Sequence, residues 1–345
     1  MTVADTFPAR FDTIAALEDY MTAPGEELVR ELATVPGDIM LLGVGGKMGP
    51  TLARLAKRAA PARRVIGVAR FSEPGLREAL AAAGVETIAC DLLDRAAIAA
   101  LPKAANVIFM AGRKFGASGD TPLTWAMNVL VPGYVAEAFA RSRIVVFSSG
   151  NIYPFVPVSG QGATEDTEAL PPPNDYSYSC LGRERVFSYF SALHGTAGRL
   201  FRLNYAIDMR YGVIHDVALK VRDGAEIDLT AGAANVIWQG DANSIALRCL
   251  AHATTPMTPI NVSGPETVSV RWLAQHCGER LGKKPILVGQ ESATGWLTNT
   301  ARMCAEFGYP KVPLLRMVDW TCDWLARGMP VHGKPTKFDV RDGKF

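Results

Sequence analysis

The chain has 345 residues, nearly half of them hydrophobic, which is enough for one large α/β domain with an appended lobe or for two domains. Its net charge of +2, from 36 basic and 34 acidic residues, gives no general reason to expect a nucleic acid or an anionic membrane as partner. No apolar run reaches the roughly 18 residues of a membrane helix, and the N-terminus lacks a secretion signal, so we expect a cytoplasmic protein. The six cysteines and five histidines show no metal-site spacing, which predicts reduced thiols and no metal.

Helical and strand patterns alternate along most of the chain. Two short helices, at 13–20 and 26–32, are predicted in an N-terminal extension, residues 1–36. The strands that follow are predicted at 39–42, 64–69, 86–90, 106–110, 143–147 and 199–203, and the later helices at 76–83, 96–101, 122–141 and 175–193. Such alternation predicts an α/β fold with a doubly wound parallel sheet.

Beyond residue 203 the alternation loosens. Short strands are predicted at 226–229, 235–239 and 260–262, and helices at 242–253, 270–280, 299–307 and 315–327. We expect residues 37–205 to form a nucleotide-binding domain, with 240–264 returning to it. Residues 206–239 and 265–330 would form a substrate lobe, and 331–345 an extended tail.

Three glycines, Gly43, Gly46 and Gly49, follow the first strand and precede the first helix of the alternation. Glycines let the backbone turn tightly and approach a pyrophosphate, which the N–H groups and the positive end of the helix would bind. The strand before and the helix after favour a dinucleotide site. The alternative is a glycine-rich turn that binds nothing.

Several separate motifs resemble those of the extended short-chain dehydrogenase/reductase family, in its NAD(P)-dependent epimerase/dehydratase group. They are the glycine turn, Asp91-Leu92, the segment from Phe147 to Tyr153, Arg202-Leu203-Asn204, Gln239-Gly240-Asp241 and the segment from Asn261 to Gly264. The resemblance covers roughly residues 37 to 330. It implies a Rossmann-type sheet with a smaller C-terminal substrate lobe.

The resemblance also implies site residues. Those expected to bind the cofactor are Gly43, Gly45, Gly46, Lys47, Met48, Gly49, Arg70, Asp91, Leu92, Ala111, Gly112 and Asn128. The substrate side would include Arg113, Lys114, Asn204 and Trp238, with Arg210 and Tyr211 as further candidates. These residues suit an anionic or polyhydroxylated ligand.

The expected catalytic set departs from the family at one position. Ser149 and Tyr176 match the family's serine and tyrosine, but Cys180 stands four residues after Tyr176, where the family has a lysine. No other tyrosine of the chain has lysine at that spacing. A phenol with a pKa of about 10 is a poor base at neutral pH, so another cation must compensate or the reaction is unusual.

Arg183 is the first candidate for that cation, since it lies seven residues beyond Tyr176 and shares its helix face. Arg113 or Lys114, just after the fourth strand of the alternation, is the second. The alternative for Arg183 is a solvated surface cation, and for Cys180 a small buried side chain.

The end of the second strand of the alternation carries Arg70 rather than an acid, with Lys47 expected nearby. Both suit a 2′-phosphate, which favours NADP. Alternatively, Arg70 could stack on the adenine, which would suit either cofactor. Glu73, three residues later, leaves NAD as a further alternative.

The resemblance implies an NAD(P)-dependent oxidoreductase, epimerase or dehydratase acting on a secondary alcohol of a sugar, sugar acid or sugar nucleotide. A homodimer would be compatible with it. The alternative is a non-catalytic NADP-binding sensor or scaffold.

Overall fold

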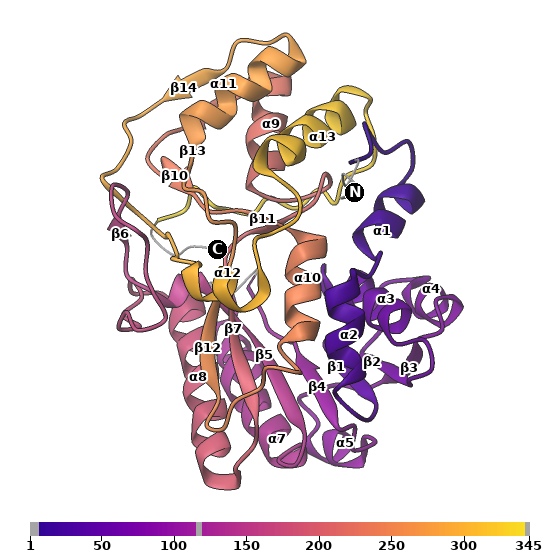
Figure 1. The fold of residues 1–345 in the computed structure, drawn as a ribbon. Coiled ribbons are helices and arrows are strands. Elements are labelled where there is room, and N and C mark those ends of the chain that lie inside the picture. Colours follow the sequence, from indigo (N-terminus) through magenta and orange to yellow (C-terminus); the bar gives the residue numbers. More distant parts are fainter. Residues whose placement is uncertain (1–6, 115–118, 342–345) are drawn as a thin grey trace.

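The computed structural model describes residues 7–114 and 119–341, and a seven-stranded sheet lies at its centre (Figure 1). In sheet order the strands are β12 (Thr258–Val262), β7 (Gly198–Leu203), β5 (Arg143–Ser149), β4 (Asn106–Phe109), β1 (Ile39–Leu42), β2 (Val65–Ala69) and β3 (Glu86–Ala89). All six pairings are parallel. The chain moves outward from β1 to β3 and then returns to β4 on the other side of β1. The predicted Rossmann-type sheet is therefore confirmed, and its strand order reverses between β1 and β4, where such sheets bind ligands.

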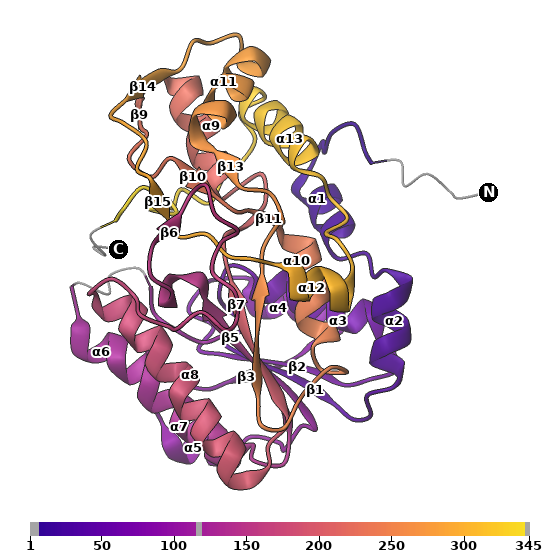
Figure 2. The same cartoon turned by 60° about the vertical axis from the view of Figure 1, so that its left-hand side comes forward.

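Helices cover both faces of this sheet, as Figure 2 shows. One face carries α5 (Arg95–Ala100), α6 (Thr121–Trp125), η1 (Ala126–Leu130), α7 (Val131–Ala138) and α8 (Asp175–His194). On the other side lie α2 (Glu26–Ala33), α3 (Gly49–Ala59) and α10 (Gln239–Arg248), with α4 (Leu76–Ala82) toward the β3 edge. Strands β1, β2 and β4 are thus buried along almost their whole length, which explains why they are largely apolar, whereas β3 at the edge is half exposed.

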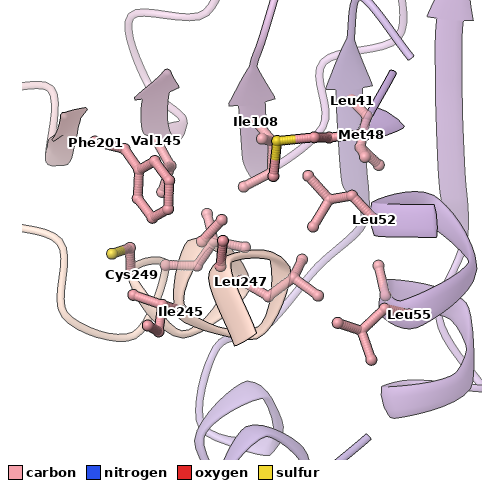
Figure 3. Packing of buried hydrophobic residues seen from close by; sticks show 14 of the residues in the cluster. Leu41, Met48, Leu52, Leu55, Ile108, Val145, Phe201, Ile245, Leu247 and Cys249 are labelled. Carbon is pink, nitrogen blue, oxygen red and sulfur yellow. The ribbon is translucent and has the colours of Figure 1, made fainter. Parts of the chain in front are cut away.

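The helix that follows the glycine turn is held by apolar packing (Figure 3). Leu52 and Leu55 of α3 lie at i and i+3, so they point from one side of the helix into the core, and both are buried. Leu41 of β1 and Leu247 of α10 belong to the same cluster. Replacing Leu52 with alanine would cost about 2–5 kcal/mol of stability. This packing fixes the start of α3 relative to the end of β1.

The helix predicted at 122–141 contains a wider turn. The N–H of Val131 bonds the carbonyl of Ala126, five residues back, so η1 is a π-helix between α6 and α7. Pro132 lacks an N–H and could not bond the carbonyl of Asn128 in a regular helix. Asn128 lies within this wider turn, and its side chain is completely buried. Such turns are frequent at functional sites.

The remaining elements form a smaller lobe at the carboxyl end of the sheet, at the top of Figure 1. Its helices are α9 (Val213–Asp223), α11 (Val270–Leu281) and α13 (Leu314–Ala326), while α12 (Ala301–Phe307) packs near β12 and α1 (Ile14–Met21) lies beside α13 and α10. The short strands are β6 (Val156–Pro157), β8 (Ala206–Ile207), β9 (Glu226–Asp228), β10 (Ala233–Ala234), β11 (Ile237–Trp238), β13 (Val268–Ser269), β14 (Ile286–Val288) and β15 (Thr294–Gly295).

Several elements of this lobe differ from the prediction, since most of its short strands were not expected. The helix α9 was not expected, although Val213, Val217 and Val221 recur at helical spacing and are buried. Of the strand expected at 235–239 only Ile237–Trp238, the strand β11, forms, because Gln239 already begins α10. No helix in the part of the chain that the structure describes has the length and apolar character needed to cross a membrane.

Candidate dinucleotide and active site

The turn between β1 and α3 can be built only with glycine at two positions. Gly43 has a φ of +94°, and a Cβ there would lie 2.7 Å from backbone atoms of Ala111. A Cβ on Gly49 would lie 2.1 Å from the carbonyl oxygen of Val44. Gly46 has room for a Cβ, whose nearest neighbour would be the Gly43 oxygen at 3.5 Å. The first glycine thus brings the ends of β1 and β4 together, and the third starts the helix.

A pocket of about 390 Å³ lies beside this turn at the ends of β1, β2, β3 and β4. Its volume is in the range of small-molecule sites. The predicted cofactor residues that line it are Gly43, Gly45, Gly46, Arg70, Asp91, Leu92, Ala111 and Gly112. Glu73 lines it too. A pocket walled by a glycine turn at the strand ends fits a dinucleotide, because such a turn lets the backbone approach a pyrophosphate closely.

Four other predicted cofactor residues lie away from this lining, among them Gly49, which is buried at the start of α3. Met48 is buried in the core, and Asn128 lies under the strand ends. Lys47 donates from Nζ to the carbonyl of Ala206, at 3.2 Å, and lies 3.9 Å from the ring centre of Tyr211. This corrects the expectation that Lys47 sits beside Arg70: its ammonium group lies at the smaller lobe. Of the two cations expected to suit a 2′-phosphate, only Arg70 lines the pocket.

Ser149, Tyr176 and Cys180 come together where β5 ends and α8 begins. Ser149 is the last residue of β5, and Asn174 caps α8 through a bond from the Ser177 N–H to its side chain at 2.8 Å. Burial and the Cys180 thiol raise the pKa of Tyr176 well above its ordinary value, while Arg183 and a hydrogen bond with Ser149 lower it. A hydrogen bond between the phenol and the Cys180 side chain raises the pKa of Tyr176 further and lowers that of Cys180.

Arg183 is not a surface cation. It is 6% exposed, and it donates to the Phe147 carbonyl and to the Asn128 side-chain oxygen, both at 2.8 Å. A Cβ on Gly112 would lie 2.5 Å from its guanidinium. Asn128 in turn accepts from the Arg113 N–H at 2.8 Å and donates to Ser179 at 2.9 Å. The guanidinium therefore ties the ends of β4 and β5 to α8 and acts on Tyr176 electrostatically.

Lys114 approaches Tyr176 from the end of β4. Its Nζ lies 5.9 Å from the Tyr176 ring centre and donates to the Thr336 carbonyl at 3.2 Å. Burial lowers the pKa of Lys114 to about 8, opposed by the Cys180 thiol and by Asp216, and its charge also lowers the pKa of Cys180. A second cation thus stands next to the Tyr176–Cys180 pair, brought there from another element.

The other predicted substrate residues are in different environments. Asn204 is 2% exposed and donates to the Trp296 carbonyl at 3.2 Å. Arg210 is ion-paired with Asp208 and Glu18. Trp238 is 2% exposed in an aromatic cluster with Tyr20 and Trp320, which corrects the expectation that it lines a substrate site. Its indole has almost no surface to offer a ligand.

The sequence prediction missed several residues around the site. Asp208 and Asp216 both act on Lys47, and Asp216 accepts from the N–H and hydroxyl of Thr336, at 2.7 and 2.5 Å. Lys334, of the same tail as Thr336, lines the pocket. No local spacing marks these residues, because they reach the site from the segment after β8, from α9 and from the tail, far away along the chain.

The sheet, the glycine turn and the pocket define a Rossmann-type protein. The chain belongs to the NAD dependent epimerase/dehydratase family, whose model matches residues 39–230. No curated protein matches the sequence.

Solved structures of similar fold include a dTDP-glucose 4,6-dehydratase from Streptomyces venezuelae with NAD (TM-score 0.71, 18% identity, covering 84% of this chain and 97% of that one). A UDP-glucuronic acid 4-epimerase from Bacillus cereus with its substrate and NAD is similar too (TM-score 0.70, 16% identity, coverage 84% and 99%). So is a UDP-glucose 4-epimerase from Thermus thermophilus with NAD (TM-score 0.69, 20% identity, coverage 84% and 99%). At these identities the likeness concerns the fold.

Proposed function

We propose that the protein is an NAD(P)-dependent epimerase, dehydratase or dehydrogenase that acts on a secondary alcohol of a sugar, sugar acid or sugar nucleotide, through an atypical Ser149–Tyr176–Cys180 site. The observation that carries this proposal is the meeting of Ser149 and Tyr176 beside a pocket walled by the glycine turn. The family and the sugar nucleotides named for the similar structures support the substrate class. The smaller lobe would hold the substrate and the sheet the cofactor.

A dinucleotide held by Gly43, Gly45 and Gly46 in this pocket would supply the hydride-transfer chemistry. Tyr176 would take the hydroxyl proton as the carbonyl forms, and Ser149 would hold the same oxygen by a hydrogen bond. This requires an ionised phenol, which burial opposes and a nearby positive charge favours. Arg183 and Lys114 would supply that charge in place of the family's lysine. Cys180, buried and neutral, would accept the phenol's hydrogen bond in the resting site.

The cofactor preference stays NADP in this proposal, with NAD as the alternative. Arg70 lines the pocket at the end of β2 with an exposed side chain, which suits a 2′-phosphate. Glu73 lines the same pocket, where it could accept from a ribose hydroxyl, and the similar structures named above contain NAD.

Single-turnover experiments would test this function. Purified protein in excess is mixed with NADP or NAD and then with UDP-glucose, UDP-glucuronic acid or dTDP-glucose, while nicotinamide absorbance is followed and the sugar is analysed by NMR. We expect reduced nicotinamide or a changed sugar with the native protein and neither with Tyr176→Phe. Excess protein is needed because an epimerase returns its hydride.

One observation favours the second candidate, a cofactor-binding sensor or scaffold. Burial and the adjacent thiol hold the pKa of Tyr176 well above its ordinary value, which disfavours a base. Tight dinucleotide binding without any change in the sugars or in the absorbance would support the sensor and contradict the enzyme.

We also propose a homodimer. Apolar side chains are exposed along α6, η1 and α8, including Trp125, Leu130 and Tyr189, which are 39, 48 and 63% exposed. Self-complementary helix faces suit a twofold interface. Light scattering should give twice the chain mass for the native protein, and the monomer mass for Leu130→Asp.

A further inference from the structure

The C-terminal tail, residues 331–341, is fixed to the body of the protein at several points. The His332 N–H donates to the Arg210 carbonyl at 3.2 Å. Thr336 is 1% exposed and bonded twice to Asp216, and Phe338 is 6% exposed in the core of the smaller lobe. Arg341 donates to the Thr294 carbonyl at 2.8 Å. These anchors give the segment a defined course.

This course brings Lys334 to the nucleotide pocket, whose lining it joins together with the glycine turn. Lys334 precedes Thr336 by two residues, so their Cα atoms are at most about 7 Å apart. The Thr336 carbonyl accepts from Lys114, which follows Ala111 and Gly112 at the end of β4. The tail therefore passes close to the segment that follows β4, in which Ala111 and Gly112 line the β1–β4 half of the pocket.

That half is where a dinucleotide would place its pyrophosphate, since the turn after β1 and the start of α3 lie there. The basic residues among the described lining are Arg70 and Lys334, and the acidic ones are Glu73 and Asp91. Lys47, within the glycine turn, points its ammonium group at Ala206 instead. The pyrophosphate's negative charges would thus meet backbone N–H groups from the turn and one side-chain ammonium from the tail.

We propose that Lys334 binds the dinucleotide pyrophosphate, which makes the C-terminal tail a part of the cofactor site. The proposal rests on the proposed function, because it requires a bound dinucleotide. Its basis is the position of Lys334 in the pocket lining and the anchoring of Thr336 two residues later. A lysine is a compact point charge on a flexible stem, which suits a phosphate without a fixed bidentate geometry. The exposed side chain of Lys334 is able to turn toward the ligand.

Calorimetric titration tests this with NADP, NAD, ADP-ribose, which keeps the pyrophosphate, and adenosine, which lacks it. Lys334→Ala should weaken binding of both dinucleotides and ADP-ribose about three- to tenfold at low salt and leave adenosine unchanged, and Lys334→Arg should restore most of the loss. The difference should shrink as salt is added. Lys283→Ala, an exposed lysine after α11, is the control for the change in net charge.

Equal ADP-ribose affinity in Lys334→Ala and the native protein would overturn the proposal and leave the dinucleotide site intact. An equal loss for adenosine and ADP-ribose would overturn it as well, because the effect would then not come from the pyrophosphate. Failure of the native protein to bind NAD, NADP or ADP-ribose would overturn this proposal and the proposed function together. Lys334 is exposed, so the variant should keep the native melting temperature.

Discussion

The glycine turn and the start of α8 lie at the same carboxyl edge of the sheet, but they build their sites differently. The turn uses backbone: Gly43 and Gly49 leave no room for a side chain, and the following helix offers N–H groups. The site at α8 uses side chains from several elements: Ser149 from β5, Lys114 from the end of β4, and Tyr176, Cys180 and Arg183 from α8. A backbone site depends on glycine at set positions, whereas a side-chain site can receive its positive charge from more than one place in the chain.

The largest expected effect is at the backbone site. In Gly49→Ala the new methyl group would lie 2.1 Å from the Val44 carbonyl oxygen, so the turn must shift. We expect a loss of about 3 kcal/mol in the free energy of unfolding and loss of dinucleotide binding. Denaturant unfolding measures the free energy of unfolding, and calorimetry measures dinucleotide binding. Gly46→Ala is the control: its methyl has 3.5 Å of room, so stability should change by less than about 1 kcal/mol. Equal stability of the two variants would contradict the argument.

The second effect concerns the reacting side chains. Tyr176→Phe and Ser149→Ala should each lower turnover by about tenfold or more, because each removes a positioned proton-transfer or hydrogen-bonding group. Dinucleotide affinity should stay near native, since the pocket lining does not include either residue. Steady-state rates and calorimetry measure both quantities. Turnover that survives Tyr176→Phe would mean that another group, such as Cys180, handles the proton.

The third prediction tests whether another cation at the α8 site replaces the lysine that the family has at the position of Cys180. Arg183→Ala should raise the pKa of Tyr176 and move the pH–rate profile to higher pH, because Arg183 lowers that pKa. It should also cost about 1–3 kcal/mol of stability, since the Phe147 carbonyl loses a buried donor. Cys180→Lys should restore a lysine-like profile. The pH–rate profile could stay unchanged in Arg183→Ala while Cys180→Lys becomes active and the native protein is inactive. That result would indicate a cofactor-binding protein that has lost its enzymatic activity.

The fourth effect separates the two cations by pH. Burial lowers the pKa of Lys114 to about 8, so its charge is present below about pH 8 and is lost above it. If this ammonium supports the Tyr176 phenolate, turnover should have a falling limb near pH 8. Lys114→Arg should remove the limb, because arginine stays protonated. If Lys114→Arg keeps the falling limb, the limb comes from a group other than Lys114. If the native protein has no falling limb, Arg183 is left as the charge that supports the phenolate.

The smallest expected effect concerns cofactor preference at the pocket beside the glycine turn. Arg70→Ala should weaken NADP binding by about tenfold or less and leave NAD binding nearly unchanged, because only NADP carries a 2′-phosphate. Calorimetric titration with both dinucleotides measures this. Tighter native binding of NAD than of NADP, or an unchanged NADP affinity in Arg70→Ala, would show that Glu73 or another group sets the preference.

The sequence by itself determined the sheet and the glycine turn. Apolar runs alternating with amphipathic helices leave few ways to bury both faces of a parallel sheet, and three glycines between a strand and a helix specify a close backbone turn. Ser149, Tyr176 and Cys180 could be aligned on family motifs, because those motifs are local in the chain. All of this information lies within short windows of sequence.

Only the tertiary structure decided where the long cationic side chains go. Lys47 points to Ala206, Arg183 is locked onto Asn128 and Phe147, and Lys114 reaches the Tyr176 ring. Each direction depends on partners far away along the chain, which spacing does not encode. The tail is the clearest case: residues rich in Gly, Lys and Asp predict only an extended arm. The position of Lys334 at the nucleotide pocket depends on such anchors as Asp216 binding Thr336, a contact between residues 120 positions apart.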